Sequence, residues 1–263
     1  MGKMRGGCVA LLWCCTILAG QPIKQAKRTS TSLLRNPIKD IFILHKNLIS
    51  GDSLKIFILS APLYALAYSQ DKRAHSCFYD EYQHANIRQL PHTCSEIAKY
   101  GIGAPIIILG SLAFLSHDTT LRTTSYAFLL GLPFVMLCKD IIKKWHIEAG
   151  KRPRNGLFSK NKCYYGGFPS GHLAQAVYMT VLFGSRYGPK AWVPLGALSI
   201  YTFAAFVNCN RHFMSQMVAG GIIGTMYGIA ANKLVDYKLA PFKHVTVYLS
   251  PRGQVELKAS FRF

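Results

Sequence analysis

Six apolar stretches constrain the fold of this 263-residue chain more than any other feature of its sequence. Each is too long for a single strand, and glycine, proline or charged residues bound them, so we expect helices. Several are shorter than the roughly 20 residues that a straight membrane span needs. The stretches lie near residues 55–69, 98–115, 124–138, 172–186, 191–208 and 213–232. We therefore predict an all-α, six-helix transmembrane bundle, with a soluble helical enzyme that has an unusually apolar core as the alternative.

The charge balance narrows the class of protein further. Only 16% of the residues are charged, yet the formal net charge is +20. Soluble domains carry about 25% charged residues. The pattern favours a membrane protein with basic loops over a nucleic-acid-binding protein, whose motifs we do not find in the sequence. The basic loops are expected to meet anionic lipid, a phosphorylated substrate or both.

The chain divides into four segments. Residues 1–20 resemble a secretory signal, with a retained anchor as the alternative, and residues 21–54 are basic with no sustained period. Residues 55–232 are predicted to form the membrane-embedded domain. In the tail, residues 233–263, apolar residues alternate with polar ones on both sides of Pro251-Arg252-Gly253, which predicts a short C-terminal β-hairpin.

Charge also suggests an orientation. If residue 1 is cytoplasmic and all six stretches span, the larger share of Lys and Arg lies inside, as the positive-inside rule prefers. Cleavage or spanning of residues 7–20 would invert this topology. The predicted orientation puts four cysteines outside, where disulfides can form between Cys77 and Cys94 and between Cys163 and Cys209.

Two polar segments beside predicted helices carry candidate binding groups. The segment from Ala149 to Gly156 gathers three cations, Lys151, Arg152 and Arg154, where a helix ends, although a basic loop is more often only a topology signal. Phe168-Pro169-Ser170-Gly171-His172 opens an apolar helix. Ser170 can cap this helix, the glycine allows close approach of a ligand, and free amides at a helix start bind anions. The ordinary interpretation is a serine cap followed by an incidental histidine.

A third polar segment, Asn210 through Gln216, contains His212. If it is helical, His212 and Gln216 share a face one turn apart. The Gln216 amide oxygen would then accept the Nδ1 proton and leave Nε2 as a nucleophile, although an isolated loop histidine is more often solvated. In the six-helix arrangement all three segments fall on one side of the membrane. Their histidines, cations and helix end are the groups that phosphoryl transfer requires.

These segments resemble the motifs of the type 2 phosphatidic acid phosphatase family, which includes lipid phosphatases and glucose-6-phosphatase. Pro169-Ser170-Gly171-His172 is similar to the second motif, Arg152-Pro153 to the end of the first, and residues 212–220 to the third. The resemblance implies that His212 is a nucleophile that forms a phosphohistidine and that His172 protonates the leaving group. It also implies that Arg152, Ser170 and the Gly171 amide hold the phosphate without a metal or other cofactor.

The chain departs from the family pattern at three positions. Trp145 stands where the first motif has Lys, and Phe206 stands where the third motif has Arg. Lys144 and Arg211 are the neighbouring cations, and we expect one of them to substitute. Gln216 replaces the usual Asp, which removes a charge that would stabilise an imidazolium.

The expected function is metal-independent hydrolysis of a phosphate monoester or pyrophosphate on a lipid, through a phosphohistidine. The predicted catalytic residues are His212, His172 and Gln216. Predicted substrate-binding residues are Lys144, Lys151, Arg152, Ser170, Gly171 and Arg211. Expected partners are a phosphorylated lipid and the membrane, not nucleic acid, and the expected location is a bacterial inner membrane with the site facing the periplasm. A lipid phosphotransferase and a non-catalytic lipid-phosphate binder are the alternatives.

Overall fold

The computed structural model describes most of the chain beyond the N-terminal region. Both backbone and side chains are described for residues 36–83, 85–145, 150–153 and 166–240, and the backbone alone for 242–249 and 255–261. The predicted signal-like segment and Cys163 lie outside these ranges, so the structure does not bear on either.

The described chain is mostly helical, with two short antiparallel strand pairs. In order, its elements are α2 (Pro37–Leu48), α3 (Gly51–Phe78), β1 (Tyr79–Asp80), β2 (Ala85–Asn86), α4 (His92–Gly101), α5 (Gly103–Leu115), α6 (Thr119–Lys143), α7 (Gly171–Tyr187), α8 (Pro189–Asn208), α9 (Met214–Leu239), β3 (Phe242–Leu249) and β4 (Val255–Phe261). Each predicted apolar stretch falls on a helix, and the second is divided at Ile102 between α4 and α5. The helical prediction is therefore confirmed.

The predicted number of spans is not confirmed. Within the described residues, four helices are long and apolar enough to cross a membrane: His92–Leu115 (α4 with α5), α6, α8 and α9. A fifth span results if α2 and α3, which meet at a bend of 43°, are counted together. α7 has only 17 residues, which is short of the roughly 20 that a straight span needs. By length and composition the chain is a helical integral membrane protein.

Helix α2 differs from the sequence prediction, which found no sustained period in residues 21–54. It begins with Pro37, a residue suited to the first helical turn, and buries Asp40 and Leu44. A charged residue on the buried face breaks the apolar period, so pattern alone does not reveal this helix.

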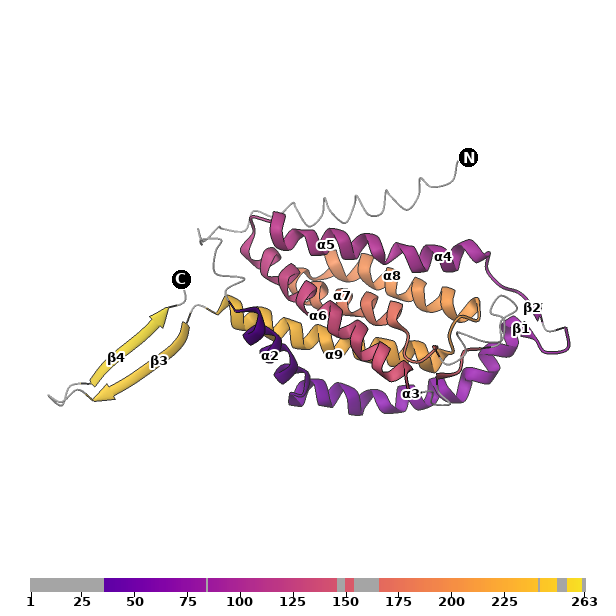
Figure 1. The fold of residues 1–263 in the computed structure, drawn as a ribbon, viewed down its shortest axis with the longest axis horizontal. Helices are drawn as coiled ribbons and strands as arrows, with labels where there is room; N and C mark the ends of the chain where they lie inside the picture. Colours follow the sequence, from indigo (N-terminus) through magenta and orange to yellow (C-terminus); the bar gives the residue numbers. More distant parts are fainter. Residues whose placement is uncertain are drawn as a thin grey trace.

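Helix α7 lies at the centre of the bundle, in contact with α6, α8 and α9 (Figure 1). Its close approach to α9 depends on glycines. A Cβ atom at Gly220 would overlap the carbonyl oxygen of Ser170, and one at Gly224 would overlap that of Ala174. The small-residue run in α9 therefore does what such runs do in membrane bundles, which is to let two backbones pack closely.

The C-terminal tail forms the predicted hairpin. β3 and β4 pair antiparallel, with Val247 opposite Leu257 and Leu249 opposite Val255. Figure 1 shows the two strands extending from the C-terminal end of α9.

The predicted disulfide between Cys77 and Cys94 is wrong, because both residues are free thiols. Cys77 is exposed in the last turn of α3, whereas Cys94 lies in the first turns of α4, where its carbonyl accepts a hydrogen bond of 3.0 Å from Tyr201 of α8. The β1–β2 pair lies between them in sequence.

Candidate functional site

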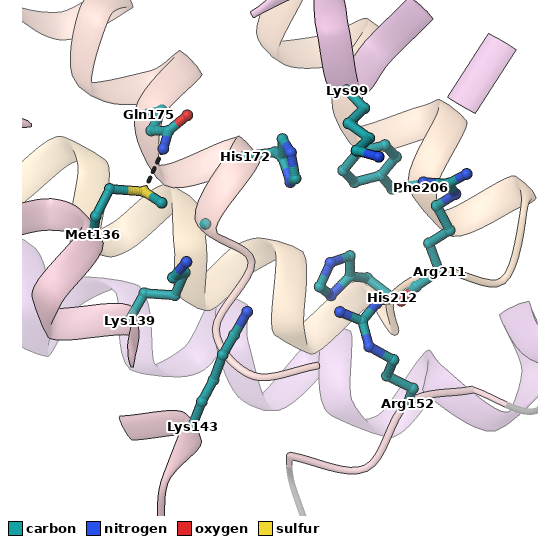
Figure 2. A pocket seen from close by; sticks show the side chains of 11 residues that line it. Lys99, Met136, Lys139, Lys143, Arg152, His172, Gln175, Phe206, Arg211 and His212 are labelled. Carbon is teal, nitrogen blue, oxygen red and sulfur yellow. Dashed lines mark hydrogen bonds between the residues drawn. The ribbon is translucent and has the colours of Figure 1, made fainter. Parts of the chain in front are cut away.

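One cavity of about 220 Å³ gathers most of the predicted site residues. It lies where α6 and α8 end and where α7 and α9 begin. Figure 2 shows the side chains around it, which come from α4, α6, α7 and α8 and from the loops between helices. The lining residues are Lys99, Met136, Lys139, Lys143, Arg152, Gly171, His172, Gln175, Phe206, Arg211 and His212. The structure therefore brings the three polar segments together.

The two histidines border the same space, with one aromatic ring beside both. Figure 2 shows both imidazoles directed into the cavity. Phe206 packs edge-on against His172, with ring centroids 5.2 Å apart, and is stacked with His212 at 5.8 Å. Phe206 is 2% exposed, so a neutral ring occupies the position where the family pattern has an arginine.

Gln216 contacts His212 as predicted, but through a different local structure. The Gln216 Oε1 atom lies 3.2 Å from His212 Nδ1 and accepts a hydrogen bond of 3.2 Å from the Phe213 amide. His212 precedes α9 rather than lying on it, and Gln216 is in the first helical turn. An Nδ1–H donor to this oxygen leaves Nε2 of the neutral ring with its lone pair available.

The environment of His212 keeps the ring neutral. His212 lies in the loop between α8 and α9 and is 5% exposed. Burial lowers its pKa well below the ordinary value of 6.5, and the charges of Arg152 and Lys143 lower the pKa further, while the Gln216 hydrogen bond opposes them. A neutral imidazole is the form that acts as a nucleophile.

Arg152 lies beside His212 and is held by two backbone carbonyls. Its Nη1 atom donates to the Arg211 carbonyl at 2.8 Å, and its Nη2 atom donates to the Gly166 carbonyl at 3.1 Å. These bonds fix a guanidinium at the cavity wall (Figure 2). Lys151 does not line the cavity; its carbonyl instead accepts a 2.6 Å hydrogen bond from the Gln216 side chain.

The cations of α6 differ from those predicted. Lys139 and Lys143 line the cavity, whereas Lys144 is exposed and does not. Residues four apart share a face of a helix, and the next residue is rotated by about 100°. Lys144, which the sequence predicted as the substitute cation, therefore lies outside the cavity, whereas Lys143, two residues before the motif position at Trp145, lines it.

Arg211 and Lys99 form the opposite wall. The Arg211 guanidinium lies over the Phe206 ring at 5.8 Å and forms an ion pair with Glu96 of α4. Lys99 approaches the other oxygen of the same carboxylate at 3.9 Å. Sequence reasoning missed Lys99, which lies outside the three polar segments.

The start of α7 is suited to an anion. Ser170 is the N-cap residue, but its side chain makes no cap hydrogen bond. Its buried Oγ atom has no hydrogen-bond partner among the described residues. Gly171 lines the cavity, and a Cβ atom there would overlap the Lys139 side chain. Free amides and the positive end of the helix dipole thus adjoin the cavity. Among the described residues, no group of three His, Cys, Asp or Glu could hold a metal ion.

The comparison with protein-family models agrees with the motif resemblance. The family model of the PAP2 superfamily matches residues 124–240. Among solved structures, the chain is similar to a transmembrane PAP2-type phosphatidylglycerolphosphate phosphatase from Bacillus subtilis, with 18% identity and a TM-score of 0.47 over 79% of this chain and 99% of that one. No curated protein sequence matches the chain significantly. The matched residues 124–240 contain both histidines of the cavity, and over them the chain is similar to the PAP2 superfamily.

Proposed function

We propose that this chain is a metal-independent phosphatase that hydrolyses a phosphate monoester or pyrophosphate carried by a lipid. The observation that supports it best is the cavity itself. Two histidines, five basic side chains and the start of α7 surround it, and no acidic side chain is among its lining residues. Such an arrangement favours an anion with charge on several oxygens, as in phosphoryl transfer.

In the first step, the phosphate binds between Arg152, Lys143 and the amides at the start of α7. Nε2 of His212 attacks phosphorus, and the bond from phosphorus to the lipid oxygen breaks. His172, which takes up a proton from solvent when the phosphate dianion binds beside it, gives this proton to that oxygen, which leaves as an alcohol, or as a phosphate if the substrate is a pyrophosphate. The product bound to the protein is a phosphohistidine.

In the second step, water attacks the phosphohistidine. His172, now neutral, accepts a proton from this water as the new oxygen–phosphorus bond forms. The bond from phosphorus to His212 breaks, inorganic phosphate is released, and both histidines return to their starting forms. General acid–base catalysis of this kind contributes about 10²–10⁴-fold.

Lipid is the proposed carrier because of where the cavity lies. Helices long enough to cross a membrane end around it, and Met136 and Phe206 add apolar surface to its wall. A substrate whose tails remain in the bilayer can present its head group at such a position.

We place the site on the periplasmic side of a bacterial inner membrane, on the basis of the charge distribution of the sequence. Cys77, which is exposed on α3, can report the orientation. A membrane-impermeant maleimide should label it in intact cells whose outer membrane is permeable. Labelling only after lysis of the inner membrane would reverse this orientation.

A non-catalytic binder is the second candidate, and Phe206 is the observation that favours it. A buried neutral ring beside both histidines removes a charge that the family pattern puts there. Arg211 and Lys99 lie next to that ring, and we propose that they supply the charge instead.

Phosphate release from a small panel of lipid monophosphates and diphosphates, with a chelator present, tests the proposal. The wild-type protein should release phosphate, and His212→Ala should not. Binding of these lipids without release by the wild-type protein would favour the non-catalytic candidate. Transfer of phosphate to a second lipid, rather than to water, would indicate a phosphotransferase.

A further inference from the structure

The helix that follows His212 cannot cap its own first turn in the usual way. Its N-cap residue is Phe213, whose side chain has no oxygen to accept the free amides. Gln216 accepts the amide of Phe213 itself. The Ser215 amide donates instead to Asp71 Oδ1 of α3 at 2.9 Å, and the Ser215 hydroxyl donates to Asp71 Oδ2 at 2.5 Å. A carboxylate from another helix therefore caps α9.

The same half of α3 holds the loop on the other side of His212. Asn210 Nδ2 donates to the carbonyl of Phe78 at 3.0 Å, and His75 packs edge-on against Phe213 with centroids 5.9 Å apart. Residues before and after His212 are thus fixed to one helix. Figure 1 shows α3 running beside α9, and the two helices pack against each other.

We propose that Asp71 is a positioning residue for His212. Asp71 is 8% exposed and belongs to α3, which precedes the matched residues 124–240. A negative charge at a helix start is favourable, and its bonds to Ser215 set where α9 begins. A displacement of about 1 Å at a nucleophile can cost about 10²-fold in rate. The inference rests on the proposed phosphatase function, since it assigns Asp71 a task in aligning the attacking nitrogen.

The chain offers a matched control on the same pair of helices. Asp52 of α3 forms an ion pair of 2.5 Å with Lys233 of α9, near the other ends of the two helices. Asp52→Ala therefore removes an α3–α9 contact without touching the His212 loop. Asp71→Ala removes the cap, whereas Asp71→Asn keeps one carbonyl oxygen that can still accept the Ser215 amide.

Turnover of the full-length protein in detergent or vesicles gives the first readout. Asp71→Ala should lower kcat about 10–100-fold with KM within about twofold, because the cavity cations are unchanged. Asp71→Asn should recover part of that loss, and Asp52→Ala should match the wild type. Wild-type kcat in Asp71→Ala, or an equal loss in Asp52→Ala, would overturn the inference.

A second readout does not need turnover. In ¹⁵N-histidine-labelled protein, the Nδ1–H signal of His212 is assigned by its loss in His212→Ala. Asp71→Ala should shift or broaden this signal, and Asp52→Ala should leave it in place. If the wild-type protein releases no phosphate, the proposed function fails, and the signal alone then decides whether Asp71 positions His212. An unchanged signal in Asp71→Ala contradicts the inference. If Asp71→Ala does not fold, Asp71→Asn is compared with Asp52→Ala in the same two assays.

Discussion

At the end of the bundle away from the cavity, buried charge is matched one to one, whereas around the cavity positive charge is in excess. Lys238 of α9 lies 2.5 Å from Asp40 of α2, and both side chains are 3% exposed. The Tyr126 hydroxyl donates to the same carboxylate at 2.8 Å. By contrast, five basic side chains and no acidic one line the cavity.

The comparison distinguishes charged groups that stabilise the fold from charged groups that we propose bind a ligand. Buried ions cost free energy unless they are paired and hydrogen-bonded. The Lys238–Asp40 pair meets that requirement within the protein. Around the cavity the nearby acids, Glu96 and Asp140, do not equal the cations in number. An arriving phosphate would supply the missing negative charge.

Among tests of the difference between the two ends of the bundle, the largest effect on turnover is expected from the cations of α6. Lys143→Met removes a charge from the cavity wall and should lower kcat/KM roughly 10–150-fold, because a hydrogen bond to a charged group contributes about 1.5–3 kcal/mol. Lys144→Met is the matched control, since Lys144 is exposed and outside the cavity. Steady-state kinetics on one lipid phosphate measures both. A larger loss in Lys144→Met than in Lys143→Met would restore the assignment made from sequence.

A smaller effect is expected from pH. Burial and nearby cations lower the pKa of His212 well below 6.5, so the neutral nucleophile persists as the pH falls through 6.5. The acid limb of kcat/KM assigned to His212 should therefore lie well below pH 6.5. In Gln216→Glu, a carboxylate beside Nδ1 favours the imidazolium and should move that limb to higher pH. A wild-type limb at or above pH 6.5, or no movement in the variant, would contradict this account.

The smallest effect on turnover is expected at the opposite end of the bundle. Asp40→Asn leaves Lys238 buried without its matching charge and should lower the free energy of unfolding by about 3–5 kcal/mol. Because the pair is far along α9 from His212, kcat and KM of the folded protein should not change. Thermal unfolding followed by kinetics on the folded fraction checks both. A change in KM would show that the two ends do not have the separate roles described here.

The sequence predicted the helices well because apolar stretches of this length have few other folds. It also singled out both histidines that line the cavity, since a motif resemblance pointed to each. It missed α2 because Asp40 interrupts the apolar face, and only the tertiary contact with Lys238 explains that position. The span count failed for α7, which is central in the bundle but short.

Some residues at the site were not predicted, or were predicted at a neighbouring position, because tertiary structure decides which side chains reach the site. Lys143 lines the cavity and Lys144 does not, because the rotation of α6 decides which side chain faces it. Lys99 and Asp71 come from helices that precede the matched family region. The contact between His212 and Gln216 was predicted, but with both residues on one helical turn. In the structure His212 precedes α9 and only Gln216 lies in its first turn.

Trapping of the covalent intermediate tests the central claim most directly. Protein incubated briefly with a ³²P-labelled lipid phosphate and quenched in base should carry label, because a phosphohistidine survives base and is lost in acid. The label should map to the peptide containing His212 and should be absent in His212→Ala. Turnover by the wild-type protein with no trapped label under any quench, or label that persists in His212→Ala, would contradict the account.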